Sequence, residues 1–270
     1  MGSGITRLPG SDDHRLRPRE HGAYAMLIFP LLSGLAMGGL SWAGIAFAAL
    51  AVSGFLAHES ILVVRGARGE RIRSKEAKHA RRRLLRLTGL AGVAAATFAV
   101  TAPANAWYAA LLSASLAVVV GMLLLARKTK SLPGELLVAA TFSSVHAVLA
   151  AAGGADARVM FLPVGAWVAC FMLATLSVHA IKYRFKRRGP GRWTVAVAPT
   201  LAGTVVLLGA IGLVLRHHPL GTTAASVLPK ALAVLLLSAL PANPRHLKRV
   251  GWIFVAADAL TLGVLVMGVR

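Results

Sequence analysis

The sequence predicts an all-α fold, a polytopic membrane bundle of about nine transmembrane helices. Of its 270 residues, 57% are hydrophobic and only 14% are charged, whereas a typical soluble domain has about 25% charged residues. The apolar residues come in blocks of about twenty, which is the length of helix that crosses the hydrocarbon layer of a bilayer. Short basic clusters separate these blocks. We therefore expect the chain to lie within a membrane.

Nine apolar runs are predicted to be the membrane helices. They cover residues 23–41, 43–64, 87–102, 105–126, 135–153, 159–182, 193–215, 223–241 and 250–269. Very short polar turns join several of them, which predicts helical hairpins, although residues 102–106 could instead belong to one re-entrant element. The helices form a single domain, 20–270. The basic tail before it, 1–19, has no apolar core, so we expect a disordered segment rather than a cleaved signal peptide.

The distribution of Lys and Arg predicts how the bundle is oriented, because these residues concentrate in cytoplasmic loops. If nine helices alternate in direction, 26 of the 30 basic residues lie on the side of the N-terminal tail. The opposite side holds the remaining four, Arg158, Arg216, Lys230 and Arg270. This asymmetry predicts a cytoplasmic N-terminus and a C-terminus on the outer side.

Composition also excludes some classes of function. The formal charge of +21 would favour nucleic acid, but the cations lie between membrane segments and few aromatic residues accompany them to stack bases. We therefore expect no nucleic acid partner. Cys170 is the only cysteine, so no disulfide within the chain and no paired-cysteine metal site can form.

Ionisable residues inside the predicted helices are candidates for function, because burying them in a bilayer costs free energy and they usually face the interior of the bundle. The set comprises His58, Glu59, Glu135, His146, His179, Lys182 and Asp258, with Arg19, Glu20 and His21 at the entrance of the first helix. Asp258 needs a partner that the sequence does not name.

These residues predict a polar cavity that opens to the cytoplasm. His58 and Glu59 lie near the cytoplasmic end of the second helix, and His179 lies at the corresponding depth in the sixth. Lys182 and Tyr183 follow His179 by three and four positions and so share its face of the helix. A cavity between these helix ends would satisfy all of these side chains.

Four interpretations of the His21, His58, Glu59 and His179 group remain open. A metal site is chemically allowed, since imidazole and carboxylate suit zinc or iron, but the HExxH spacing is absent and we expect no metal. The others are a proton relay or transport site, a pocket for an anionic or polar lipid headgroup, and structural hydrogen bonds. Glu135 and His146 are eleven residues apart, close to three helical turns, so they are predicted to share one stripe of the fifth helix.

Residues 18–27, which read PREHGAYAML, together with Pro30, resemble the opening of the YwiC-like family of bacterial membrane proteins. The His58–Glu59 pair and residues 249–252 also resemble that family. The resemblance implies a multi-pass protein of the bacterial cytoplasmic (inner) membrane. The family has no assigned biochemical activity, so it implies no reaction.

A more distant resemblance is to the UbiA superfamily of intramembrane prenyltransferases, on the strength of nine helices, the basic loops after the second and sixth helices and residues 126–130. It implies an isoprenyl diphosphate bound through magnesium, which two Asp-rich motifs hold at the ends of those helices. The corresponding residues here, 58–62 and 177–183, contain no aspartate. Magnesium requires hard oxygen ligands, so it is not expected, and no other cofactor can be named.

We therefore expect the cavity to bind or transform an isoprenoid or another anionic membrane lipid, as a degenerate UbiA-like prenyltransferase would. The expected catalytic residues are His58, Glu59 and His179. The expected binding residues are Arg19, Glu20, His21, Arg65, Lys128, His146, Lys182 and Tyr183. The rival functions are a proton-coupled transporter, with a polar path through His146, and a noncatalytic membrane partner of another enzyme, whose identity the sequence does not give.

Overall fold

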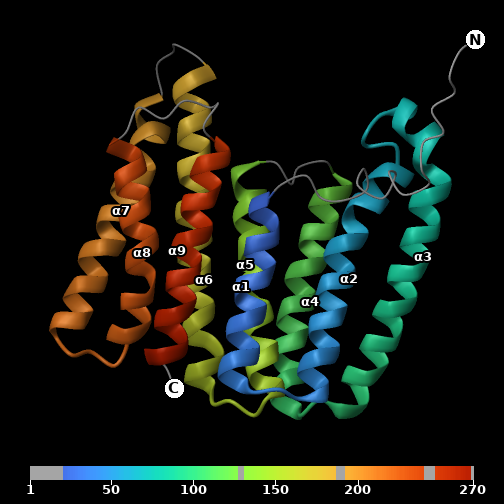
Figure 1. Cartoon of the computed structure of the whole chain (residues 1–270), viewed down its shortest axis with the longest axis horizontal. Coiled ribbons are helices and arrows are strands. Elements are labelled where there is room, and N and C mark those ends of the chain that lie inside the picture. Colours follow the sequence, from blue (N-terminus) through green and yellow to red (C-terminus); the bar gives the residue numbers. More distant parts are fainter. Residues whose placement is uncertain (1–20, 127–130, 187–191, 240–246, 269–270) are drawn as a thin grey trace, which may run out of the picture.

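The computed structural model is a bundle of roughly parallel and antiparallel helices (Figure 1). It describes residues 21–126, 131–186, 192–239 and 247–268. Within these ranges, only the backbone is described at His21, 184–186 and 192–196. Within these ranges the chain forms nine helices and no strand. They are α1 (His21–Gly38), α2 (Trp42–Val64), α3 (Glu70–Thr101), α4 (Ala104–Leu125), α5 (Leu132–Ala152), α6 (Ala157–Lys186), α7 (Arg192–Leu215), α8 (Gly221–Ala239) and α9 (Leu247–Gly268).

The lengths and composition of these helices confirm the predicted multi-pass membrane bundle. Eight of the described helices are long and apolar enough to cross a bilayer, and the apolar part of α1, Gly22–Gly38, is slightly shorter. Residues 102 and 103 separate α3 from α4, so this region is a hairpin rather than a re-entrant element. The helix that contains the predicted membrane segment 87–102 is longer than that segment, because α3 begins at Glu70. Most of the predicted basic loop is therefore helical.

Local sequence explains several helix ends. The side chain of Ser41 accepts a hydrogen bond from the Gly44 backbone N–H at 3.0 Å, and Ser131 caps α5 at Gly134 in the same way. Each cap satisfies one of the backbone N–H groups that the first turn of a helix leaves without a partner. Gly39 follows α1 with a φ of +87°, a conformation that favours glycine, and so permits the tight reversal into α2.

Helices α1 and α5 pack closely at two glycines of α1. Gly34 and Gly38 form a G-x-x-x-G sequence on α1, and a Cβ atom at Gly34 would lie 2.7 Å from the Cβ of Leu149 and 2.9 Å from the carbonyl oxygen of His146. At Gly38 it would lie 2.6 Å from the Cα of Ala150. Small residues let two membrane helices approach until their backbones touch. These glycines therefore hold α1 against the most buried part of α5.

The buried apolar residues form two large cores and a small contact between Val63 of α2 and Ala80 of α3. One lies among α1, α2, α4 and α5 and includes Leu27, Val148 and Leu149, with Phe98 of α3 against it. The other lies among α6, α8 and α9 and includes Trp167 and Val234. Helix α1 contributes to both, since its Met26 and Phe29 pack against the second core. It therefore joins the two halves of the molecule.

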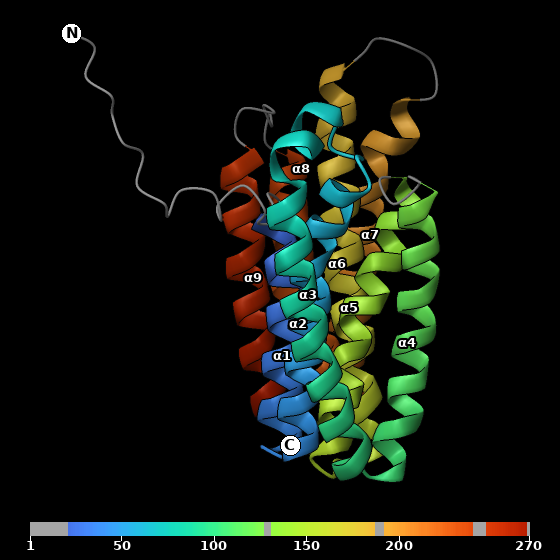
Figure 2. The same cartoon turned by 90° about the vertical axis from the view of Figure 1, so that its right-hand side faces the viewer.

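Helices α3, α4 and α7 lie at the periphery and present large apolar side chains outward, as expected for helices in contact with lipid. Although α3 and α4 follow one another directly, α3 packs on α2 and α4 packs on α5. The two helices diverge from their shared turn, as the second view shows (Figure 2). In the half of α4 from Ala114 to Leu125, no residue is buried.

Candidate functional site

The predicted site residues divide into those that the structure describes and those that it does not. Arg19, Glu20 and Lys128 lie outside the described residues, and so does the side chain of His21. The predicted tail, residues 1–19, also lies outside the described part of the chain. The remaining candidates lie on α2, α5 and α6 and at the turn after α2.

Glu59 is held by an arginine of its own chain. Its carboxylate is buried in α2, with 2% of the residue exposed, and Arg68 donates to it through Nε at 2.8 Å and through Nη2 at 2.6 Å. Arg68 lies in the turn after α2, between Gly66 and Gly69, whose φ angles of +71° and +99° favour glycine. Both carboxylate oxygens are engaged in this bidentate pair. Glu59 therefore ties the turn back onto α2.

His179 pairs with a different carboxylate. Its Nε2 lies 2.8 Å from Oε2 of Glu135, which belongs to the first turn of α5, and the two side chains are 21% and 33% exposed. An acidic residue is favoured in the first turn of a helix by the positive end of its dipole. Lys182 and Tyr183, one turn further along α6, are exposed. This end of α5 and α6 therefore carries a partly accessible acid–base pair.

The predicted cavity residues thus belong to two pairs on different helices. Helices α2 and α6 both pack on α5, which lies between them (Figure 1). Glu59 bonds within the α2 hairpin, and His179 bonds across the contact between α5 and α6. His58, beside Glu59, is half-buried on α2. The described contacts do not join the two pairs into one cluster.

His146 belongs to a buried network that links three helices. Its Nδ1 lies 2.8 Å from the hydroxyl of Ser33 on α1, which also accepts a hydrogen bond from Nε1 of Trp167 at 2.9 Å. Its Nε2 lies 2.9 Å from the carbonyl oxygen of Val159 on α6. A carbonyl oxygen only accepts, so Nε2 carries a proton. Both ring nitrogens are engaged and the residue is fully buried, which favours the structural interpretation of His146 over ligand contact.

The bonds of Glu135 and His146 also agree with the predicted stripe on α5. Glu135 bonds a side chain of α6, and His146 bonds the backbone of α6 three turns away. A transport path through His146 finds little support in this geometry, because no atom of that residue is accessible.

Among the described residues, one ion pair has both charges buried, and the sequence did not identify this pair. Lys230 of α8 and Asp258 of α9 form an ion pair with Nζ 2.6 Å from Oδ1, and their side chains are 0% and 4% exposed. The ammonium also donates to the carbonyl oxygen of Phe254 at 3.0 Å and lies 4.8 Å from the centre of that ring. The expectation that Lys230 lies on the outer side was wrong, because the residue is inside the bundle.

A signal for this pair was present in the sequence. Lys230 lies nine residues before the end of α8, and Asp258 lies eleven residues after the start of α9. In an antiparallel hairpin these positions have nearly the same depth. Opposite charges at one depth in adjacent spans are expected to pair, since either charge alone in a bilayer is costly. The equal depth of Lys230 and Asp258 is not noticed when each membrane segment is considered separately.

A pocket lies between the end of α2 and the end of α4. Its volume is about 270 Å³. It is lined by Ile61, Leu62, Arg65, Ala67, Leu124 and Leu125. One cation and five apolar residues therefore surround it. Arg65 is exposed, and in the described part of the chain no carboxylate pairs with it. None of the six residues carries a carboxylate, so the lining offers no side-chain oxygen for magnesium.

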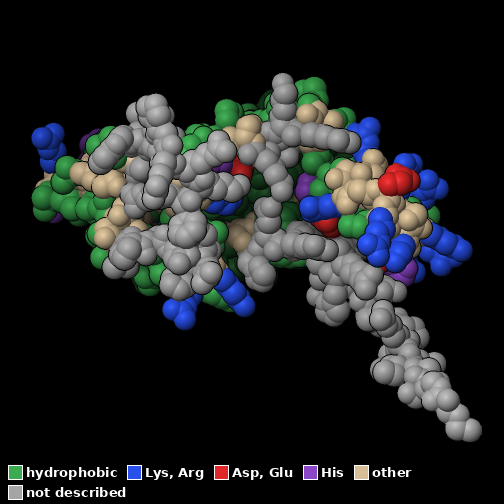
Figure 3. Space-filling model, turned by 90° about the horizontal axis from the view of Figure 1, so that it is seen from above, with side chains coloured by type: hydrophobic (Ala, Val, Ile, Leu, Met, Phe, Trp, Pro, Cys, Tyr) green, Lys and Arg blue, Asp and Glu red, His purple; other side chains and the backbone are tan. Residues whose placement is uncertain are grey.

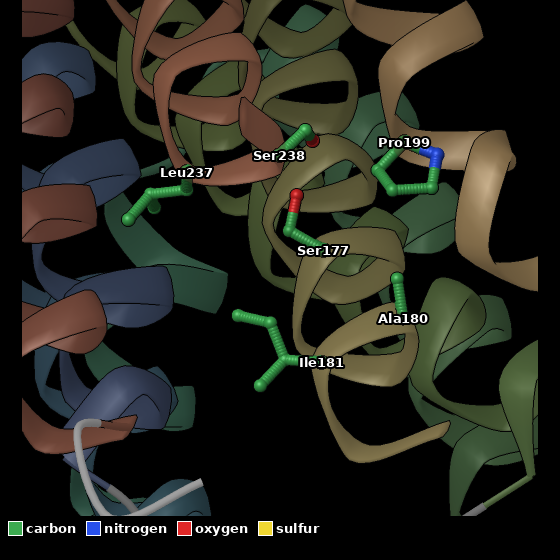
Figure 4. A pocket seen from close by; sticks show the side chains of 6 residues that line it. All are labelled: Ser177, Ala180, Ile181, Pro199, Leu237 and Ser238. Atoms are coloured by element: carbon green, nitrogen blue, oxygen red, sulfur yellow. The ribbon is translucent and has the colours of Figure 1, made fainter. Parts of the chain in front are cut away.

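A second hollow, between α6, α7 and α8, is much smaller (Figure 4). Ser177, Pro199 and Leu237 are among its lining residues, and its volume is about 10 Å³. That space is close to the least that one water molecule needs. Elsewhere among the residues that the structure describes, no three His, Cys, Asp or Glu side chains are grouped so that they could hold a metal ion.

Comparison with known proteins gives one match. The sequence model of the family described as YwiC-like protein matches residues 17–150, which extend from before α1 to nearly the end of α5. No curated protein and no solved structure matches the chain. The likeness to UbiA architecture is not tested by these comparisons and stays a prediction. The pocket at Arg65 lies entirely within the matched residues.

Proposed function

We propose that this multi-pass membrane protein, whose residues 17–150 match the YwiC-like protein family, binds an anionic lipid in the pocket between α2 and α4. Arg65 would contact the anionic head, and the apolar residues around it would contact the first part of the lipid chain. A phospholipid and an isoprenoid phosphate share this chemistry. The observation that carries the proposal is a cation that no described carboxylate pairs with, in a pocket whose other lining side chains are apolar.

The position of Arg65 supports an anionic head rather than a neutral one. Arg65 follows Val64, the last residue of α2, and so lies where a membrane helix reaches the headgroup layer. Arg68, three residues further on, is already paired with Glu59, whereas no described carboxylate neutralises Arg65. A guanidinium can bind a phosphate through two parallel hydrogen bonds. An anion at Arg65 would therefore be held directly and would not require a metal ion.

The exposure of α4 supports a lipid chain below the head. Leu124 and Leu125 line the pocket, and no residue from Ala114 to Leu125 is buried. Helix α4 packs on α5, while its buried residues, Ala106 to Ser113, belong to the opposite end. The end of α4 near Arg65 therefore offers apolar surface on several sides. A lipid chain would cover this surface as it descends from the pocket.

The contacts favour binding over chemical transformation. Glu59, an expected catalytic residue, uses both carboxylate oxygens on Arg68. His179 and Glu135 form an acid–base pair, but they belong to α5 and α6 and are not among the residues that line the pocket. No titratable group besides Arg65 lines it. We therefore assign the proposed site to lipid recognition.

The same proposal includes a location and an orientation. The YwiC-like family suggests a bacterial cytoplasmic membrane, and the basic end of the bundle would face the cytoplasm. A single cysteine introduced at Ser74 on α3 or at Arg216 after α7, each with Cys170→Ser, tests this in sealed inverted and right-side-out vesicles. An impermeant maleimide should label residue 74 only from the cytoplasmic side and residue 216 only from the other.

Lipid binding is tested by native mass spectrometry of the purified protein released from its own membrane. Arg65→Gln should reduce the retained anionic lipid by about tenfold, which corresponds to the loss of one charge-assisted contact. Arg249→Gln is the matched control, because it removes an exposed cation at the start of α9, at the same end of the bundle. Equal lipid retention by the wild type and Arg65→Gln would refute the proposal.

A further inference from the structure

The first part of α3 extends beyond the membrane. Helix α3 has 32 residues, or about 48 Å at 1.5 Å per residue, whereas the hydrocarbon layer is about 30 Å thick. Its apolar sequence begins at Leu84. The residues before Leu84 therefore continue the helix out of the bilayer, and α3 rises above the adjacent ends of α2 and α4 in Figure 1.

Four cations form a stripe on this extension, Arg71, Lys75, Lys78 and Arg82. Their spacings of four, three and four residues place them on one face of the helix, and all four are exposed. Ala80, which is fully buried, is nine residues from Arg71, or two and a half turns, and so lies on the opposite face. The stripe therefore points directly away from the bundle. Seen from above, Lys and Arg side chains gather at this end of the molecule (Figure 3).

The height of the stripe separates it from the lipid surface. Lys75 and Arg71 lie about 14 and 20 Å above the edge of the hydrocarbon layer, whereas the headgroup layer is about 5 to 8 Å deep. Electrostatic attraction falls off over about 8 Å at physiological ionic strength. Helical side chains also lean toward the N-terminus of the helix, which here is away from the bilayer. Anionic lipids therefore do not account for the upper half of the stripe.

The rest of this chain does not supply a partner for the stripe. No acidic residue lies on it, and like charges spaced by three and four residues repel one another. The N-terminal 20 residues contain three carboxylates but four arginines, and the whole chain contains only nine acidic residues against thirty basic ones. Neither the tail nor a second copy therefore has the charge to complement it. Residues 70–86 also contain no Phe, Trp or Tyr, so aromatic stacking of nucleic acid bases is absent.

We infer that the stripe binds an acidic helical segment of a second protein at the basic end of the bundle. A helix with carboxylates at spacings of four, three and four residues would place one carboxylate opposite each cation, along about 16 Å. This inference is independent of the lipid proposal, because none of the four cations lines the pocket at Arg65.

The test uses the full chain in nanodiscs of zwitterionic phosphatidylcholine and a synthetic helical peptide with Glu at positions 1, 5, 8 and 12. A second peptide has the same composition, with its Glu residues distributed around the helix. Wild-type protein should bind the aligned peptide at least about tenfold more tightly than the second one. The variant with Arg71, Lys75, Lys78 and Arg82 all changed to Gln should lose this preference.

The matched control changes Arg73, Arg81, Lys248 and Arg249 to Gln, which removes the same charge from exposed positions outside the stripe. It should retain the preference for the aligned peptide. Equal binding of the two peptides, or equal losses in the two variants, would overturn the inference in favour of diffuse charge attraction. Two further results would also overturn it: loss of peptide binding when the nanodiscs contain anionic lipid, or stripe-dependent binding of a short RNA that is tighter than binding of the aligned peptide.

Discussion

Two buried polar clusters inside the bundle are stabilised in different ways, one by hydrogen bonds between neutral groups and the other by an ion pair. Around His146, neutral groups from α1, α5 and α6 share hydrogen bonds through Ser33 and Trp167. In the other half of the molecule, Lys230 and Asp258 place two full charges side by side on α8 and α9. The first cluster joins helices that are distant in sequence, and the second holds one hairpin together.

The difference between the clusters concerns what remains when one partner is lost. A neutral network that loses one group leaves an unpaired dipole, which costs a modest amount of free energy. A buried ion pair that loses one charge leaves the other uncompensated in a region without water. The hairpin should therefore tolerate removal of both charges better than removal of one, whereas losses in the network should be smaller and graded.

The largest effect is expected from Lys230→Met, which leaves Asp258 without its cation. We expect the free energy of unfolding in detergent micelles to fall by about 3 to 5 kcal/mol. The double variant Lys230→Met/Asp258→Leu should recover most of that loss, because no charge remains buried. Titration with a denaturing detergent, followed by circular dichroism, measures both changes. Equal destabilisation by the single and double variants would show that side-chain packing, and not the unpaired charge, determines the loss of stability.

The next effect tests the helix contact on which the neutral network depends. Gly34→Ala would place a Cβ 2.9 Å from the carbonyl oxygen of His146, pushing α1 from α5 beside the Ser33–His146 bond. We expect a loss of about 2 kcal/mol, within the usual range for overpacking. Gly54→Ala on α2 is the control, because a Cβ there meets no atom within 4 Å. The same unfolding measurement should show no loss for Gly54→Ala, and a matching loss would contradict the assigned role of Gly34.

A smaller effect is expected from Ser33→Ala, which removes the central hydroxyl of the network. Nε1 of Trp167 and Nδ1 of His146 would then lack a shared partner. We expect a loss of about 1 kcal/mol, since hydrogen bonds between membrane helices contribute modestly. Ser115→Ala is the control, because that exposed hydroxyl bonds only its own helix. A Ser33→Ala loss as large as that of Lys230→Met would remove the distinction between the two clusters.

The smallest effect is expected at the pair between Glu59 and Arg68, which is charged like the α8–α9 pair but reaches solvent. Arg68 is 34% exposed, so water can stabilise its guanidinium when Glu59→Gln removes the negative charge. We expect a loss of about 0.5 kcal/mol in the same titration, and this loss should shrink further in high salt. A loss close to that of Lys230→Met would mean that exposure does not govern the cost of an unpaired charge here.

The periodic features of the fold could be predicted from the sequence, because hydrophobic length alone identifies membrane helices. The part of α3 before the predicted membrane segment was not foreseen, because Arg71, Lys75 and Lys78 are good helix formers that the apolar pattern ignores. Hydropathy identifies only the part of a helix that lies in the bilayer. The helical backbone of α3 continues beyond that part into water.

The candidate site was less predictable than the fold, for a physical reason. His58, Glu59 and His179 were grouped because their helix ends have the same depth, but depth does not specify which helices are neighbours. Helix α5 lies between α2 and α6. Glu59 therefore pairs with Arg68, and His179 pairs with Glu135. Conversely, Lys230 and Asp258 were not grouped, although equal depth in consecutive spans would have paired them.

The position of α1 has a consequence for biosynthesis. Its main contacts are with α5 and α9, and it packs little on α2. Helix α9 begins about 200 residues after α1 ends, and a ribosome adding about 5 to 20 residues per second needs roughly 10 to 40 s to produce them. During that interval α1 lacks one of its two main neighbours. The face of α1 that packs on α9 must therefore be sheltered by lipid or by the insertion machinery until α9 is made.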